Sequence, residues 1–180
     1  GSDKWYKIKQ RAKRKIDDIA VELLRVQAKR ELSNGYKFSL DNLAYDKFCS
    51  LFPYVETDDQ LNTINDVISD MCSIKSMDRV VCGDVGFGKT EVILRASFIA
   101  ANNDKQVVII VPTTVLAKQH FETFKRRFSK YSYNIGIVTR ATSRLERLSI
   151  IDKLYNNQIH ILIGTHALLN KDFKCADLGL

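Results

Sequence analysis

The stretch "VVCGDVGFGKTEV", residues 80–92, decides the fold of this 180-residue chain. Its central octet, residues 83–90, fits the pattern G-x-x-x-x-G-K-[ST] at every fixed position. Glycines let a backbone adopt unusual dihedral angles and approach an anion without a Cβ in the way. Successive amide groups and the N-terminus of a following helix then face that anion. The stretch therefore predicts a cradle for the phosphates of a nucleoside triphosphate.

The fixed residue types of the cradle indicate the chemistry of the site. The Lys89 ammonium would reach the β- and γ-phosphates, and the Thr90 hydroxyl would be a ligand of Mg²⁺. These two are the candidate catalytic residues, and Thr90 is the candidate metal ligand. The predicted cofactor-binding residues of the cradle are Gly83, Asp84, Val85, Gly86, Phe87, Gly88, Lys89, Thr90 and Glu91. The alternative is a glycine-rich turn that fits the pattern by chance.

The residues around the octet alternate between short β-branched runs and amphipathic patterns. We expect strands at residues 79–82, 107–111, 135–139 and 159–163. We expect helices at residues 89–101, 115–130 and 143–156. Such alternation indicates an α/β fold in which a parallel sheet is covered on both faces.

The first part of the chain is predicted to be helical. Apolar residues recur at steps of three and four from Trp5 to Val26, which describes one stripe of a long helix over residues 3–33. The stripe needs a cover, so we expect this helix to pack on the following domain or on a neighbour. The lysines and arginines of its first half are either a solvated face or a contact for phosphates or an acidic partner. Shorter helices are expected at residues 41–51 and from 58 to about 72, with Thr57 as a cap.

Composition narrows the class of protein without choosing a function. The net charge of +7 is compatible with a polyanionic partner. No apolar run approaches the roughly 20 residues of a membrane-spanning helix. The cysteines form no CxxC pair and no metal-ligand spacing, so we expect the reduced thiols of a cytoplasmic protein. Residues 1–2 are typical of an expression scar.

Several stretches occur together in a fixed order: "FPYVETDDQ" (52–60), "GDVGFGKTEV" (83–92), "VPTTVLAKQHFETF" (111–124) and "GTHALL" (164–169). In that order and spacing they resemble the first motor lobe of RecG-like superfamily 2 helicases and translocases. The resemblance is greatest to bacterial transcription-repair coupling factors, because "WYKIKQRAKRKIDDIAVELL" (5–24) and "MCSIKSMDRVVCGD" (71–84) also look like that family. It implies a RecA-like P-loop NTPase lobe, with ATP and Mg²⁺ as cofactors.

The resemblance also implies roles for residues outside the cradle. Phe52 and Gln60 take the position of the adenine-recognition motif, although spacing alone favours a core phenylalanine and a solvent-facing glutamine. The residues that match the DNA-backbone motifs are Thr113, Thr114, Gly164, Thr165 and His166. Arg140 looks like a further phosphate contact, but Ala141 stands where the family has an aromatic residue, and a plain surface arginine remains the alternative.

By the same resemblance, the parent protein would be an ATP-driven translocase on double-stranded DNA in the bacterial cytoplasm. It would displace stalled RNA polymerase and recruit excision-repair proteins through modules outside this segment. Residues 3–35 would be a connector helix and residues 36–180 the N-terminal part of the first motor lobe.

An acidic pair for hydrolysis is not found in the sequence. Asp152, the nearest candidate, falls within a helical pattern. We therefore expect a piece that lacks the acid-bearing strand and the second lobe, binds ATP weakly and does not hydrolyse it. An open sheet edge would invite self-association, and the oligomeric state stays open. The alternatives are a RecG- or PriA-like helicase lobe, a small kinase, and a non-catalytic ATP-binding interaction module.

Overall fold

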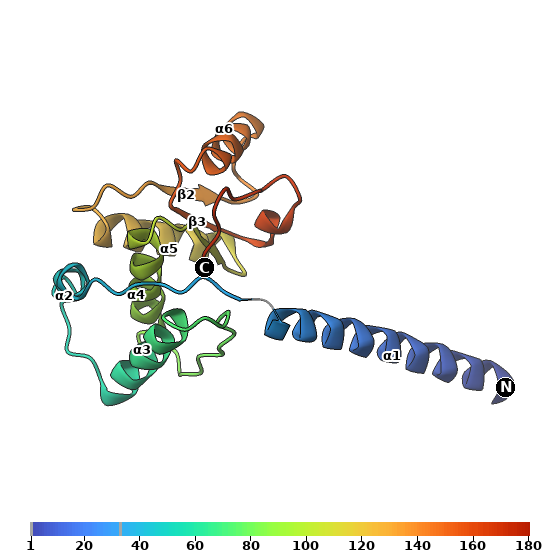
Figure 1. The fold of residues 1–180 in the computed structure, drawn as a ribbon. Coiled ribbons are helices and arrows are strands. Elements are labelled where there is room, and N and C mark those ends of the chain that lie inside the picture. Colours follow the sequence, from blue (N-terminus) through green and yellow to red (C-terminus); the bar gives the residue numbers. More distant parts are fainter. Residues whose placement is uncertain (1, 33) are drawn as a thin grey trace.

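The computed structural model describes residues 2–32 and 34–180 (Figure 1). Its elements are α1 (Ser2–Leu32), α2 (Asn42–Cys49), α3 (Asp58–Met71), α4 (Lys89–Asn102), β1 (Val107–Ile110), α5 (Thr114–Arg127), β2 (Ile135–Val138), α6 (Arg144–Tyr155), β3 (Ile161–Gly164) and the short 3₁₀ helix η1 (His166–Leu169). Every expected helix is confirmed to within three residues at each end. Gly1, part of the expected scar, and Ser33, the expected last residue of the first helix, lie outside the described residues.

The sheet has three parallel strands in the order β1-β3-β2. In the central strand β3, Ile161 lies opposite Val107 of β1 and Ile135 of β2. All four residues of β3 are buried, as expected for a parallel strand with both faces covered. The α/β class is confirmed, and so are three of the four expected strands.

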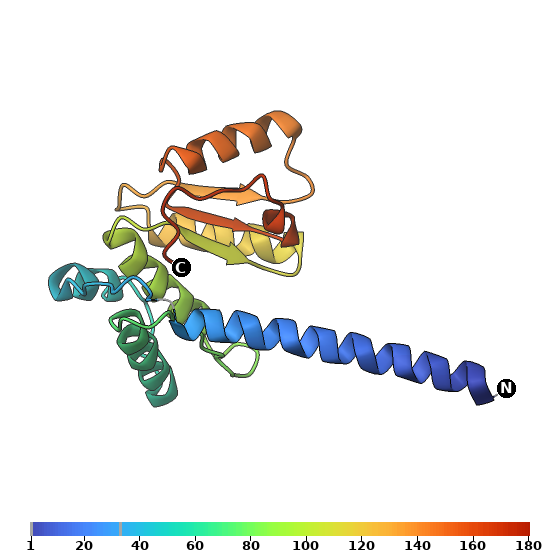
Figure 2. The ribbon, with the colours of Figure 1, turned by 45° about the vertical axis from the view of Figure 1, so that its right-hand side comes forward.

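Alternate residues of β3 contribute to two different cores. Ile161 and Ile163 belong to the larger core, which includes Phe98 of α4 and Phe124 of α5. Leu162 belongs to a smaller core beneath α6. Figure 2 accordingly shows α5 and α6 on opposite sides of the sheet. The parallel sheet thus fixes where α5 begins, because this helix follows β1, and α4 packs against the same core.

The expected strand at residues 79–82 is wrong, because this segment is irregular and lies along α3. Arg79 donates from Nε to Oδ2 of Asp70 at 2.6 Å and from Nη1 to Oδ2 of Asp66 at 2.9 Å. Val80 remains 85% exposed. A strand requires a neighbour for its backbone groups, and no strand among the described residues pairs with this segment.

The edge of β1 that faces away from β3 is held by the last residues of the chain. Leu178 forms a parallel bridge with Gln106, and the Val108 N–H donates to the Leu180 carbonyl at 2.9 Å. The fully buried Gln106 side chain also accepts from the Asp177 N–H at 3.0 Å. This pairing is the second reason why residues 79–82 are not part of the sheet.

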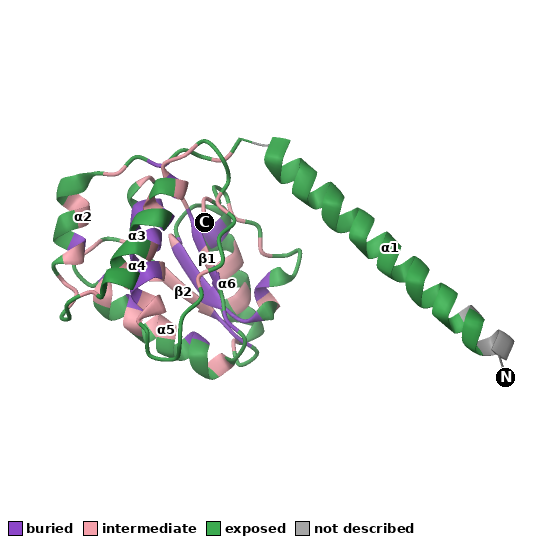
Figure 3. Ribbon diagram, turned by 90° about the horizontal axis from the view of Figure 1, so that it is seen from below, coloured by how far each residue is buried: buried purple, intermediate pink, exposed green. Residues whose placement is uncertain are grey.

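Helix α1 extends away from the α/β domain (Figures 1 and 3). Its apolar stripe is exposed, with Trp5 at 64% and Leu23 at 65%. The expectation that the helix packs on the following domain is therefore wrong, and a cover supplied by a neighbour stays a prediction. Near its end, Arg30 forms an ion pair with Asp78. Among the described residues, no helix has the length and hydropathy that crossing a bilayer requires.

The contact of Arg79 with Asp70 gives a pH-dependent prediction. The hydrogen bond from Arg79 lowers the pKa of the Asp70 carboxyl. A lowered pKa in the folded state stabilises the fold above the usual carboxyl pKa, and this contribution is lost as pH falls through the lowered value. Asp70→Asn should therefore reduce the free energy of unfolding by at most about 1 kcal/mol at neutral pH, and by less at pH 2.

Urea unfolding followed by circular dichroism at both pH values measures this difference. Asp18→Asn on exposed α1 is the matched control and should change neither value. An effect of Asp70→Asn that is equally large at both pH values would contradict the ion pair.

Candidate nucleotide-binding site

The octet forms a turn at the N-terminus of α4, in the place that the sequence predicts. The backbone φ angles are +88° at Gly86 and +72° at Gly88, which L side chains rarely adopt. Within the described part of the chain, the amides of Gly86, Gly88, Lys89 and Thr90 have no hydrogen-bond acceptor. Unpaired N–H groups at a helix start carry partial positive charge. This arrangement fits the phosphate groups of a nucleotide.

The Lys89 ammonium lies across the turn. It donates to the Gly83 carbonyl at 2.5 Å and to the Asp84 carbonyl at 2.7 Å. Val85 is fully exposed at the tip of the turn. The ammonium therefore already lies within the turn, where phosphate oxygens could replace the two carbonyls as its acceptors.

Gln60 connects α3 to the cradle. Its Oε1 accepts from the Thr57 N–H at 2.9 Å within a capping box, and its Nε2 donates to the Phe87 carbonyl at 2.7 Å. A Cβ built on Gly88 would lie 2.3 Å from Nε2, so a side chain at this position would displace the Gln60 amide from the turn. The amide keeps a second N–H and a second lone pair, which can still meet the edge of a base.

A cavity of about 830 Å³ adjoins the cradle. Phe52, Gln60, Gly86, Gly88 and Thr90 all line it. Its volume lies within the range of roughly 300–1,000 Å³ that is typical of ligand sites. The structure thus brings the predicted base-binding residues Phe52 and Gln60 to one cavity with Gly86, Gly88 and Thr90 of the cradle. The other cradle residues Gly83, Asp84, Phe87 and Lys89 line a neighbouring cavity of about 440 Å³, which Gln60 also borders.

A buried ionic network forms the floor of this cavity. Oε1 of Glu91 accepts from Arg95 Nε and from Arg127 Nη2, each at 2.8 Å. Arg95 also pairs with Glu56, and this hydrogen bond lowers the pKa of the Glu56 carboxyl. Glu91 was expected among the cofactor-binding residues, but its carboxylate is only 5% exposed and is held by two cations. Glu91 nevertheless lines the cavity, so its role in cofactor binding stays a prediction.

The predicted DNA contacts gather at the carboxyl ends of the parallel strands, where ligands of open α/β sheets collect. Thr113, followed by Thr114, caps α5 by accepting from the Leu116 N–H at 3.2 Å. Arg140 and His166, both exposed, lie 3.4 Å apart between Nη2 and Nε2. Beyond Gly164, the last residue of β3, Thr165 is only 2% exposed, so its hydroxyl does not reach the surface.

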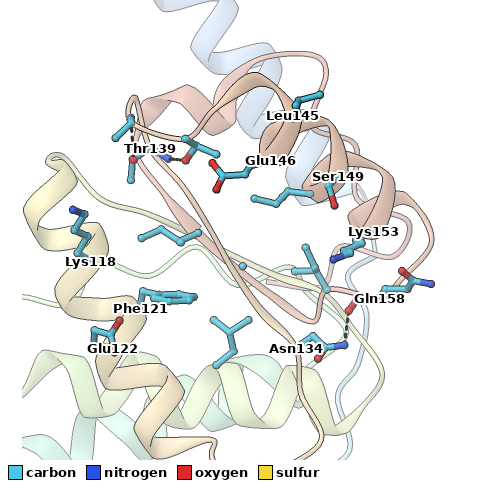
Figure 4. A pocket seen from close by; sticks show the side chains of 17 residues that line it. Lys118, Phe121, Glu122, Asn134, Thr139, Leu145, Glu146, Ser149, Lys153 and Gln158 are labelled. Carbon is cyan, nitrogen blue, oxygen red and sulfur yellow. Dashed lines mark hydrogen bonds between the residues drawn. The ribbon is translucent and has the colours of Figure 1, made fainter.

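The largest cavity, about 1450 Å³, lies elsewhere, between α5 and α6 beside β2 (Figure 4). Its lining includes Lys118 and Phe121 from α5 and Glu146 and Lys153 from α6. None of the residues expected to bind ATP or DNA lines it. Size alone therefore does not locate the site in this fold.

Residues 57–179 match the model of the DEAD/DEAH box helicase family. The chain belongs to the DEAD/DEAH box helicase family. The matched range contains Gln60, the whole cradle and the three strand ends, whereas Phe52 lies before it. Membership in a helicase family implies the use of ATP.

The chain is also similar to transcription-repair-coupling factors. It is 49% identical to the protein of Haemophilus influenzae, 47% to that of Escherichia coli and 47% to that of Bacillus subtilis, each over 180 residues. Each similarity extends over all of this chain. It covers 16% of the H. influenzae protein, 16% of the E. coli protein and 15% of the B. subtilis protein. A solved structure of RecG bound to a three-way DNA junction superposes with a TM-score of 0.79 at 32% identity, covering 86% of this chain and 21% of that one.

Sequence reasoning missed Arg95 and Arg127, which hold the floor of this helicase site. Glu91 and Arg95 are four residues apart on one helix, a spacing that could have indicated an ion pair. Arg127 is 36 residues from Glu91 and has no such local signal. Among the described residues, no cluster of acidic, histidine or cysteine side chains could hold a metal by itself.

The contact between Gly88 and Gln60 gives a stability prediction. Gly88→Ala adds a left-handed backbone penalty of about 1–2 kcal/mol and a clash with the amide. Gly86→Ala is the matched control, because its φ is also positive but nothing lies within 4 Å of its Cβ position. Urea unfolding should show a larger loss for Gly88→Ala, and the excess should vanish in a Gln60→Ala background. Equal losses for the two alanine variants would rule out the close packing of Gln60.

Proposed function

We propose that this chain is the ATP-binding and DNA-gripping part of an ATP-driven double-stranded DNA translocase. The observation that carries the proposal is the set of unpaired amides at the start of α4, next to a cavity that also contains Phe52 and Gln60. Helix N-termini with free N–H groups bind phosphates. A cavity whose lining includes aromatic rings and an amide side chain suits the base.

Each side chain of the cradle then has a task. Lys89 exchanges its two carbonyl partners for phosphate oxygens, and the Thr90 hydroxyl becomes a ligand of Mg²⁺. Gln60 offers its free N–H and lone pair to the adenine edge, while Phe52 stacks on the ring. ATP supplies a phosphoanhydride whose cleavage drives motion in the whole protein.

Phosphate contacts without base contacts suit a motor that moves along any sequence. Arg140 and His166 offer two adjacent polar side chains on the surface, and the start of α5 at Thr113 and Thr114 offers backbone N–H groups. We propose that these groups hold the DNA backbone. Gly164 and Thr165 would support this surface from beneath.

The chain spans about one sixth of the curated relatives it matches, so the activity of a whole protein is inferred from them. We propose that the parent displaces stalled RNA polymerase and couples transcription to excision repair in the bacterial cytoplasm. In the parent, α1 would connect this domain to the polymerase-binding module, and its exposed apolar stripe would pack against a neighbouring part of the protein. The likeness to RecG favours a junction-processing helicase as the second candidate. The domains that flank this segment in its gene distinguish the two.

Binding of Mg-ATP tests the cradle directly. Isothermal titration should show weak binding by the wild-type chain and no binding by Lys89→Ala. Lys47→Ala, an exposed lysine on α2, is the control and should bind like the wild type. ATP binding that survives Lys89→Ala would remove the cradle from the proposal. No phosphate release is expected from this chain, because no acidic pair follows a strand within residues 34–180.

Binding of duplex DNA tests the proposed grip. Contacts with phosphates release counterions, so affinity should fall steeply as salt rises. Arg140→Ala should weaken binding to unrelated sequences by similar factors and reduce the slope of log K against log salt by about 1. Lys47→Ala again serves as the control. A salt-independent affinity, or an unchanged slope in Arg140→Ala, would contradict the grip.

A further inference from the structure

We propose that Arg127 is a positioning residue for base recognition: by bridging Glu91 and Phe52, it holds the aromatic platform in register with the phosphate cradle. This inference rests on the proposed function of the site. It concerns how two parts of one ATP site, the base pocket and the cradle, are held together.

Arg127 ends α5, and its side chain is only 8% exposed. Nη2 donates to Oε1 of Glu91 at 2.8 Å, and Glu91 lies in the first turn of the helix that begins at the cradle. The guanidinium carbon lies 4.7 Å from the ring centroid of Phe48 and 5.8 Å from that of Phe52. Phe48 is completely buried in the core, so one end of this stack is fixed.

Phe52 has no regular secondary structure to hold it. It lies in the segment between α2 and α3, and its N–H donates to the Cys49 carbonyl at 2.9 Å. Its ring contacts Tyr54 edge-on and the guanidinium groups of Arg95 and Arg127. Both guanidinium groups are bound to the same carboxylate oxygen of Glu91. The orientation of the ring relative to α4 is therefore set through Glu91.

An unpaired donor of Arg127 supports a role for this residue in the cavity. Nε of Arg127 is buried and has no hydrogen-bond partner among the described residues, although Arg127 lines the 830 Å³ cavity. Buried donors are rarely left unpaired in folded proteins. A ligand or water in the cavity that accepts from this N–H would complete the network.

If Arg127 positions the base platform, its loss should weaken binding of a ligand that has a base and not binding of a ligand that has only phosphates. Arg127 contacts neither the cradle amides nor Lys89, whose partners are the Gly83 and Asp84 carbonyls, so affinity for Mg-tripolyphosphate should stay within a factor of two in Arg127→Met. Affinity for Mg-ATP should fall about tenfold, because stacking of one base on an aromatic ring contributes on that order. The ratio of the two dissociation constants, measured by isothermal titration, is therefore the readout.

A double-mutant comparison tests whether Arg127 acts through Phe52. Phe52→Leu removes the platform, so adding Arg127→Met to it should cause no further loss of ATP affinity. Lys125→Met, which removes an exposed cation from the same helix, is the control and should leave the ratio unchanged. Losses that multiply in the double variant would overturn the positioning role, as would equal loss of both ligands in Arg127→Met.

Removing one partner of a buried ion pair can prevent folding. If Arg127→Met does not give a folded circular dichroism spectrum, Arg127→Lys decides by the same ratio, since it keeps a cation for Glu91 but loses the flat guanidinium. A wild-type ratio in Arg127→Lys would overturn the inference. Failure of the wild-type chain to bind either ligand would instead overturn the proposed function, and this inference with it.

Discussion

Unpaired N–H groups at the first turn of α4 are the constraint around which the site is built. Every helix leaves such groups without intrahelical partners, and here Gly86 and Gly88, both with positive φ angles, have no Cβ that could block access to them. The Lys89 ammonium keeps the turn in shape through two carbonyls. Gln60 then packs against Gly88, where a side chain would both displace the amide and strain the left-handed backbone. The rest of the cavity is arranged around this one helix start.

The charged network at the floor of the cavity fixes the relative positions of its neighbours more than it adds to the free energy of folding. Ion pairs inside a protein lose much of their attraction to the cost of desolvation, so they are weak as a source of folding free energy. Their geometry is nevertheless strict, because Glu91 binds two guanidinium groups through a single oxygen. Three parts of the chain are joined there: the first turn of α4, the end of α5 and the segment that carries Glu56. The proposed phosphate cradle and the proposed base pocket are thereby connected through Glu91 and its two guanidinium partners.

Sequence patterns predicted those features that depend on neighbours along the chain. The helices, the cap at Thr57 and the turn of the cradle are local, so periodicity and residue type were sufficient. Residues 79–82 have the composition of a strand, but a strand exists only beside another, and Arg79 holds this segment on α3 instead. The pairing of Arg127 with Glu91 and the burial of Thr165 depend on tertiary packing, which no local pattern contains.

Helix α5 connects the two proposed binding surfaces. It begins after Thr113, at the strand ends where DNA is proposed to lie, and ends at Arg127, which contacts both Glu91 and Phe52. Fourteen residues of helix are about 20 Å long. Phe124, fully buried in the core, keeps the helix pressed against the sheet between these ends. A rigid element that touches both sites is a physical route by which a change at one can reach the other. Arg127 is hydrogen-bonded to Glu91 in the first turn of α4. A shift of α4 on nucleotide binding would therefore displace the end of α5 first.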